Sequence, residues 1–214
     1  MSEAPAYDTV AELYSELFLH DLDRVTFDRD VLDAFVAGLG GEAPVYKSVV
    51  LDVGCGPGHV TDYLRRAGVH VVGSDLSIEM IRQANRHFPD GQHLVGDFAS
   101  LPHPVSSIGG IVSRYSVIHL PPESLALVFE EWARVLAPGA PLMLSGFAAD
   151  RQGHGQPFDH KVATAHQLCP EVLVEQLAEV QFCETSVSMR GPLSDEPRQM
   201  RHFAVAARLG SEAN

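Results

Sequence analysis

The sequence has few of the features that mark secreted, membrane-spanning or metal-stapled proteins. Its 214 residues include only three cysteines, Cys55, Cys169 and Cys183. Their odd number and wide spacing exclude a disulfide framework and a CxxC zinc knuckle. No apolar run approaches the roughly 20 residues that cross a bilayer, and residues 1–5 lack the basic start of a signal peptide. We therefore expect a cytoplasmic protein with reduced thiols and no membrane partner.

Positive charge is also scarce. The chain has 15 Lys and Arg against 28 Asp and Glu, which gives a formal net charge of −13 at pH 7. Such a charge repels a phosphate backbone, and no cluster of basic residues interrupts it with a positive face. The sequence therefore excludes nucleic acid as a partner and favours a small-molecule substrate, while it leaves the oligomeric state open.

What the sequence does contain is the composition of an ordinary folded domain. Hydrophobic residues make up 45% of the chain and charged residues 20%, a balance that argues against disorder. At this length we expect one domain over residues 1–214. Within it we expect an N-terminal helical cap over 1–45, a core that binds a cofactor over 46–147, and an acceptor loop, a helix and a C-terminal strand pair over 148–214.

Short β-branched runs alternate with amphipathic segments along most of the chain. Helical spacing of apolar residues predicts a helix over 9–19 and a second one that Asp28 or Asp30 caps and Gly40 and Gly41 end. Strands are expected at 48–53, 70–74, 92–95, 110–114, 141–147, 183–189 and 202–209. Further helices are expected at 60–67, 78–87, 122–136 and 170–180. This alternation predicts a doubly wound α/β sheet, with the last two strands as an antiparallel pair at one edge.

One segment interrupts this alternation. Residues 148–165 are polar, contain Gly and His, and are too long for an ordinary turn. Loops of this length usually serve as lids or binding loops. We expect the segment to help choose the substrate.

The first strand runs into a glycine-rich turn and then a helix. Gly54, Gly56 and Gly58 let the backbone turn tightly and approach a ligand closely, and amides at a helix start favour a negative group. A GxGxG turn alone is weak evidence, because dinucleotides and other adenosyl ligands both use such turns. Asp75 sharpens it, since a carboxylate after the second strand can accept hydrogen bonds from both ribose hydroxyls. Asp75 can also cap the following helix, and the two roles are compatible.

Four motifs resemble those of class I S-adenosylmethionine-dependent methyltransferases, in the same order. They are residues 50–58 (VLDVGCGPG), 72–80 (VGSDLSIEM), 96–98 (GDF) followed by Leu101-Pro102, and 134–139 (RVLAPG). Together they cover about residues 49–147. The strand segment 113–116 lacks the Pro-Pro-aromatic signature of relatives that methylate nucleic-acid amines, and the pattern resembles small-molecule enzymes of the quinone-biosynthesis and natural-product type.

The resemblance implies the fold, the cofactor and its contacts. It implies a mostly parallel seven-stranded sheet of order 3-2-1-4-5-7-6 with strand 7 antiparallel, under an N-terminal helical lid. It implies S-adenosyl-L-methionine as cofactor and S-adenosyl-L-homocysteine as product. The turn would approach the methionyl portion, Asp75 the ribose and Asp97 the adenine amine. The cofactor-binding residues it implies are Asp52, Gly54, Gly56, Gly58, Asp75, Leu76, Met80, Asp97, Phe98 and Ser113.

Methyl transfer is a direct displacement, so it needs alignment of the reactants and a base when the acceptor carries a proton. His119 and His160 are candidate bases because the reference pKa of histidine is near neutrality, and Tyr14 could reach the acceptor. Each also has a structural interpretation: His119 could pack under the sheet, His160 could be solvated and Tyr14 could be core. The spacing of the histidines in 154–166 matches no metal motif, so no metal is expected.

We expect methyl transfer to a small organic acceptor, with O-methylation favoured over C- or N-methylation. Two alternatives stay open from sequence. A nicotinamide-dependent oxidoreductase also uses a glycine turn and an acidic residue, although its spacing is GxGxxG. A non-catalytic binding module with this fold is the other, because fold does not fix function.

Overall fold

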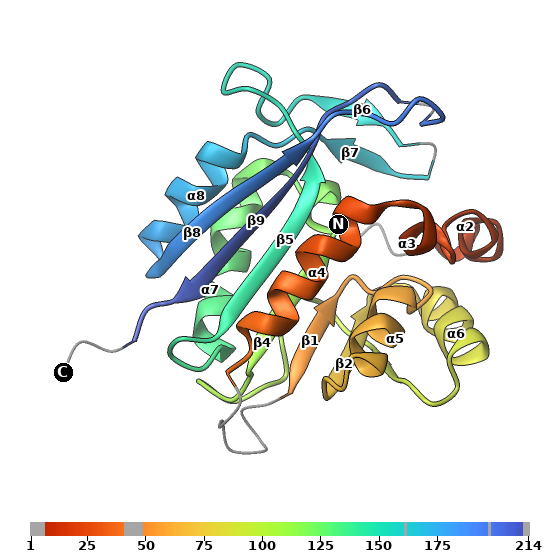
Figure 1. Cartoon of the computed structure of the whole chain (residues 1–214), viewed down its shortest axis with the longest axis horizontal. Helices are drawn as coiled ribbons and strands as arrows, with labels where there is room; N and C mark the ends of the chain where they lie inside the picture. The colour runs from red at the N-terminus through yellow and green to blue at the C-terminus, as the bar shows by residue number, and fades with distance from the viewer. Residues whose placement is uncertain (1–6, 41–48, 161, 197, 212–214) are drawn as a thin grey trace.

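A seven-stranded sheet forms the centre of the molecule (Figure 1). The computed structural model describes residues 7–40, 49–160, 162–196 and 198–211. The strand order is β3-β2-β1-β4-β5-β9-β8; β1 to β5 are parallel, and β9 is antiparallel to both β5 and β8. The strands are β1 (Val50–Val53), β2 (Val71–Asp75), β3 (Gln92–Val95), β4 (Gly110–Arg114), β5 (Pro141–Phe147), β8 (Phe182–Arg190) and β9 (His202–Leu209). The expected order is confirmed once the separate β6-β7 pair is left out of the count.

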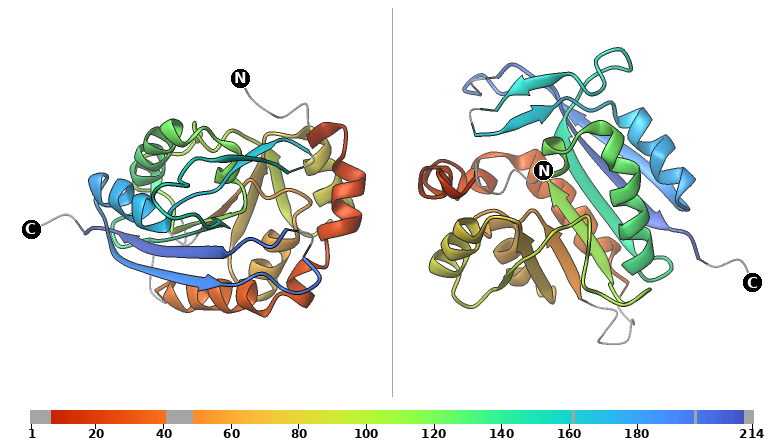
Figure 2. Two further views of the ribbon diagram at one scale, coloured as in Figure 1. Left: turned by 90° about the horizontal axis from the view of Figure 1, so that it is seen from above. Right: turned by 180° about the vertical axis from the view of Figure 1, so that it is seen from behind.

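Helices cover both faces of the sheet, which makes it doubly wound (Figure 2). On one face, Phe35 of α4 and Leu64 of α5 pack on Val112 and Met143; on the other, Trp132 of α7 and Leu173 of α8 pack in the larger core. The central strands β1, β4 and β5 are buried on both sides, as parallel strands between helical layers must be. The helices are α2 (Ala11–Phe18), α3 (Asp21–Arg24), α4 (Thr26–Gly38), α5 (His59–Arg66), α6 (Ile78–His87), α7 (Leu125–Val135) and α8 (Pro170–Glu179).

Two expectations about local structure were wrong. The helix that was expected to begin at Asp28 or Asp30 is α4, which begins at Thr26 after Val25. Asp28 does not cap it, because its side chain is buried in the first turn and forms an ion pair with Arg114. The predicted end at Gly40 and Gly41 is also late, since α4 ends at Gly38; Gly41 lies outside the described residues.

The segment 148–165 is not a simple loop. It contains β6 (Pro157–Asp159), which pairs with β7 (Thr164–His166) as a small antiparallel ribbon apart from the main sheet. Sequence patterning missed these strands because three residues are too few for a period of two to show. The ribbon lies close to the 3-10 turn η2 (Val117–His119) that follows β4.

In the described part of the chain, no helix combines the length and the apolar character that a membrane span requires.

Candidate active site

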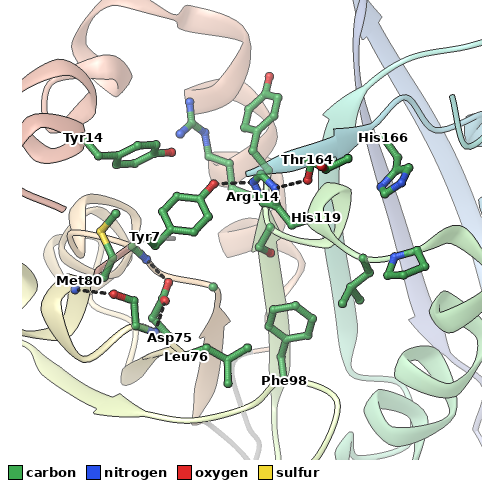
Figure 3. Close-up of a pocket in the computed structure, with 17 residues that line it drawn as sticks. Tyr7, Tyr14, Asp75, Leu76, Met80, Phe98, Arg114, His119, Thr164 and His166 are labelled. Carbon is green, nitrogen blue, oxygen red and sulfur yellow. Dashed lines mark hydrogen bonds between the residues drawn. The ribbon is translucent and has the colours of Figure 1, made fainter. Parts of the chain in front are cut away.

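A cavity of about 360 Å³ opens at the carboxyl ends of β1, β2 and β4 (Figure 3). This edge of an open α/β sheet is where ligands bind. Its lining combines the glycine turn, the start of α6, the end of β4, the N-terminal segment and β7. The lining residues are Tyr7, Tyr14, Gly54, Gly56, Asp75, Leu76, Ser77, Met80, Phe98, Arg114, Tyr115, Ser116, His119, Leu120, Pro121, Thr164 and His166.

The glycine turn is shaped by a close approach to Ser116, which lies between β4 and η2. Gly54 has a φ of 73°, and a Cβ built on it would lie 2.2 Å from Cβ of Ser116. Only glycine avoids both the left-handed strain and this overlap. Gly58, in contrast, does not line the cavity: its Cα faces Ala84 of α6, where an added Cβ would come within 2.9 Å. The turn therefore presents Gly54 and Gly56 to the cavity and packs α5 against α6 through Gly58.

Asp75 sits at the carboxyl end of β2 and faces the cavity. Its two carboxylate oxygens accept hydrogen bonds from the backbone amides of Gly56 and Ser77, each at 2.9 Å. These bonds fix the carboxylate between the glycine turn and the start of α6. The position fits a group that accepts hydrogen bonds from a diol, because each oxygen keeps a further lone pair.

Apolar side chains form the wall next to Asp75. Leu76, Met80 and Phe98 line the cavity, and Met80 and Phe98 are buried. The indole N–H of Trp132 donates to the carbonyl of Phe98 at 2.9 Å, which anchors the segment after β3 to α7. Asp97 lies outside this lining: its side chain is exposed and accepts from the amide of Ala99 at 2.8 Å. A flat apolar ring system fits this wall.

Two other predicted cofactor ligands lie behind the cavity wall. The hydroxyl of Thr61 donates to Asp52 at 2.6 Å, which ties β1 to α5. The hydroxyl of Ser113 meets that of Ser116 at 2.6 Å, and Ser116 donates to the carbonyl of Val53 at 2.8 Å. Neither Asp52 nor Ser113 is among the lining residues. Both position the turn, and direct contact with a cofactor stays a prediction for each.

Asp52 gives a testable pH dependence of stability. Burial raises the pKa of Asp52 from its ordinary 3.8 to about 7, although the hydrogen bond from Thr61 opposes the shift. The folded state therefore binds the Asp52 proton more tightly than the unfolded state does. The stabilisation that this proton gives is lost as the pH rises from about 4 to about 7. We expect Asp52→Asn, which mimics the protonated acid, to remove this decline of about 4 kcal/mol from the free energy of unfolding.

The measurement is urea unfolding of the cofactor-free protein at several pH values between 4 and 8. The difference between Asp52→Asn and the unsubstituted chain should grow with pH. Equal slopes in the two proteins would contradict a raised pKa at Asp52.

His119 lies on η2 with both ring nitrogens engaged. Its Nδ1 is 3.0 Å from the carbonyl oxygen of Thr164, which can only accept, so Nδ1 carries the proton. Nε2 then offers a lone pair, and the hydroxyl of Tyr7 donates to it at 2.6 Å. Burial lowers the pKa of His119, outweighing the bond to Thr164. A neutral imidazole with its basic nitrogen toward the cavity is the form required of a general base.

The other two predicted catalytic residues occupy different places. His160 is not in the lining; its ring packs edge-to-face on His119 with centroids 5.3 Å apart, and it also contacts Phe147. Burial lowers the pKa of His160 to about 4. Tyr14 lines the cavity, and burial raises the pKa of its hydroxyl to about 12. Tyr14 can therefore donate a hydrogen bond but does not act as a base near neutral pH.

Sequence reasoning missed the charged centre of the site, Arg114. Its guanidinium lines the cavity at the end of β4 and bonds to Asp21 at 2.7 Å and Asp28 at 2.5 Å. It also donates to Nε2 of His59 at 3.1 Å. Burial alone would lower the pKa of Arg114, but the neighbouring carboxylates raise it overall. A lone Arg at a strand end was the only available signal, because its partners lie 86 and 93 residues earlier.

Tyr115, the next residue, was also missed. It adopts a φ of 52°, in the left-handed region that a bulky residue rarely enters. Its hydroxyl meets Nδ1 of His202 in β9 at 2.6 Å, and the guanidinium of Arg114 lies 4.9 Å from its ring centre. A strained residue at a cavity wall is typical of functional sites.

A doubly wound sheet with a glycine turn and a fixed carboxylate at its carboxyl edge defines a Rossmann-like protein that binds an adenosyl group. Residues 50–139 match the family described as a methyltransferase domain. A malonyl-acyl-carrier-protein O-methyltransferase of Erwinia billingiae is 33% identical over 177 residues, which is 74% of this chain and 70% of the relative. Four further relatives of that name match over 40% or less of their own length. The chain belongs to the class I S-adenosylmethionine-dependent methyltransferases.

Solved structures show the same fold. An S-adenosylmethionine-dependent methyltransferase of Methanosarcina mazei superposes with a TM-score of 0.68 at 23% identity, covering 79% of this chain and 95% of that one. The geranyl diphosphate C-methyltransferase of Streptomyces coelicolor, in complex with Mg²⁺, geranyl-S-thiolodiphosphate and S-adenosyl-L-homocysteine, has a TM-score of 0.66 at 16% identity, over 85% of this chain and 76% of that one. The cofactor is S-adenosylmethionine, and the nicotinamide and non-catalytic alternatives find no support.

Proposed function

We propose that this methyltransferase acts on a hydroxyl oxygen of a small organic acceptor and that His119 is its general base. The observation that carries the proposal is the hydrogen bond from Nδ1 of His119 to the carbonyl of Thr164. It fixes the tautomer and leaves the lone pair of Nε2 on the side that faces the cavity. A hydroxyl needs such a base, whereas a carboxylate does not, because it is already ionised.

The residues of this chain fit the cofactor. When bound, S-adenosylmethionine supplies a methyl group on a positively charged sulfur. We propose that Asp75 accepts from its ribose, that Leu76, Met80 and Phe98 hold its adenine, and that the turn at Gly54 and Gly56 leaves room for its methionyl portion. Gly58, Asp52 and Ser113 act by supporting the turn and β4. Asp97 stays a predicted ligand of the adenine amine.

Asp75 provides the test of the cofactor site. Asp75→Ala removes a charged acceptor and should raise the Kd for S-adenosylhomocysteine by about 10- to 100-fold. Isothermal titration of the purified variant measures this change. The matched control is Asp97→Ala, which removes an exposed carboxylate and should raise the Kd by less than about 10-fold. An equal loss of affinity for S-adenosylhomocysteine in the two variants would show that Asp97 contributes as much to cofactor binding as Asp75 does.

The acceptor chemistry has its own test. The protein is incubated with S-adenosylmethionine carrying a deuterated methyl group and with phenols, alcohols, amines, carboxylates and activated carbon acids, and products are identified by mass spectrometry. The proposal expects methyl ethers, with kcat/KM falling below about pH 6.5 as Nε2 of His119 takes a proton. Methylated amines or carbon acids with no ether would contradict it.

A further inference from the structure

The hydroxyl of Tyr7 occupies the position that a reacting hydroxyl would need. It donates to Nε2 of His119 at 2.6 Å from within the cavity (Figure 3). The ring of Tyr7 is held edge-to-face by Tyr14, with centroids 5.8 Å apart, and by His119, at 5.3 Å. A phenol from the N-terminal segment is therefore already bound to the base in the geometry of proton transfer.

We infer that the acceptor is a neutral phenol whose hydroxyl takes the place of the Tyr7 hydroxyl on His119, and that carboxylates are excluded. The inference rests on the proposed O-methylation. In the step it describes, the phenol oxygen forms the new O–C bond and its proton passes to Nε2 of His119. The C–S bond of the sulfonium breaks, which leaves S-adenosylhomocysteine.

The strength of the base supports a phenol over an aliphatic alcohol. Burial lowers the pKa of His119 from its ordinary 6.5. A phenol, with a pKa near 10, is only about 3.5 orders of magnitude less acidic than an ordinary imidazolium. A hydroxyl as weakly acidic as water, with a pKa near 15.7, would be about nine orders less acidic. A weak base matches the more acidic hydroxyl.

The charges of the cavity wall oppose a carboxylate. Arg114 is the single guanidinium or ammonium group among the described lining residues. Asp21 and Asp28 both bind Nη2 of Arg114, so the three groups together carry a net negative charge. Oδ1 of Asp28 is buried without a hydrogen-bond partner among the described residues. Asp75 adds a further carboxylate to the lining, and the described lining residues hold no second guanidinium or ammonium group that could neutralise an acidic acceptor.

The relatives named malonyl-acyl-carrier-protein O-methyltransferases are named for an acceptor with a different charge from the one proposed for this chain. A malonyl group carries a free carboxylate, which is already ionised near neutral pH and needs no base. This chain offers the opposite: a base with a fixed tautomer and a cation that is already paired. The net charge of −13 also disfavours the approach of an anion.

The test uses the shape of the Tyr7 side chain. Tyr7→Ala should leave a hole that p-cresol, the tyrosine side chain without its backbone, can fill, as small molecules fill engineered cavities. Binding is measured by isothermal titration with S-adenosylhomocysteine present. We expect p-cresol to bind the variant at least 10-fold more tightly than the unsubstituted chain, and its carboxylate counterpart p-toluate to bind at least 10-fold more weakly than p-cresol. With S-adenosylmethionine, p-cresol should yield 4-methylanisole.

Tyr7→Phe is the matched control: it keeps the ring that fills this space, so it should bind p-cresol at least 10-fold more weakly than Tyr7→Ala does. Two results would overturn this inference but not the proposed function. One is tight binding of p-toluate to Tyr7→Ala. The other is no binding of p-cresol to Tyr7→Ala while S-adenosylhomocysteine still binds. If the unsubstituted chain does not bind S-adenosylhomocysteine, the proposed function itself is overturned.

The charge argument has a separate variant. Asp21→Asn, in the Tyr7→Ala background, raises the net charge around Arg114 by one while Asp28 still holds the guanidinium. The affinity for p-toluate should rise by at least about 3-fold, since Asp21 acts electrostatically on Tyr14 in the cavity wall and even a screened unit charge contributes on that order. The affinity for p-cresol should not change. An unchanged affinity for p-toluate would contradict the exclusion of carboxylates by charge.

Discussion

Replacing His119 with alanine should lower kcat/KM by about 10²- to 10⁴-fold, the usual contribution of a positioned general base. The variant loses the lone pair of Nε2 but none of the residues proposed to hold the cofactor, so the Kd for S-adenosylhomocysteine should change little. The decline in activity of the unsubstituted enzyme below about pH 6.5 should disappear with it, because burial places the pKa of His119 below that value. Steady-state kinetics from pH 5 to 9 measure both effects.

His160→Ala is the control for this variant. His160 contacts the ring of His119 with centroids 5.3 Å apart but does not line the cavity. Its removal should lower kcat/KM by less than about 10-fold and should preserve the dependence on pH. Added imidazole should restore part of the activity of His119→Ala and none of that of His160→Ala. A larger loss of kcat/KM in His160→Ala than in His119→Ala would indicate that His160, and not His119, is the base.

The parts of the site that sequence predicted are those that depend on local backbone geometry. Gly54, Gly56 and Asp75 lie where a strand meets a helix, so short motifs carry their full structural requirement. The alternation of elements predicted the doubly wound sheet and its antiparallel edge pair. The order of the strands came only from the resemblance of the four motifs to the methyltransferase family. Leu76, Met80 and Phe98 also line the cavity, and their contact with the cofactor stays a prediction.

The parts that sequence could not give depend on contacts between distant segments. Arg114 is paired with carboxylates that lie about 90 residues earlier, on helices whose docking no local pattern reveals. The tautomer of His119 depends on the carbonyl of Thr164, in a three-residue strand that has no periodic signal. The hydroxyl of Tyr7 reaches His119 across 112 residues. The partners of Arg114, His119 and Tyr7 could therefore be found only from the three-dimensional structure, although His119 itself was a candidate.

Gly54→Ala should destabilise the fold by about 2–5 kcal/mol and abolish cofactor binding. Two costs add at this position. A non-glycine residue at a φ of 73° costs roughly 1–2 kcal/mol. The new Cβ would also lie 2.2 Å from Cβ of Ser116, so the turn and the start of η2 must separate, and such overpacking costs about 1–3 kcal/mol. Urea unfolding gives the stability, and titration with S-adenosylhomocysteine gives the affinity.

Gly68→Ala separates these two costs. Gly68 has a φ of 88°, but no atom lies within 4 Å of the position that its Cβ would take. It should therefore lose only the roughly 1–2 kcal/mol of backbone strain and keep full cofactor affinity. Ser116→Gly completes a double-mutant cycle with Gly54→Ala: the second substitution should cost less in the Gly54→Ala background than alone, because it removes the overlapping atom. Additive effects would show that backbone strain, and not contact with Ser116, is what requires glycine at position 54.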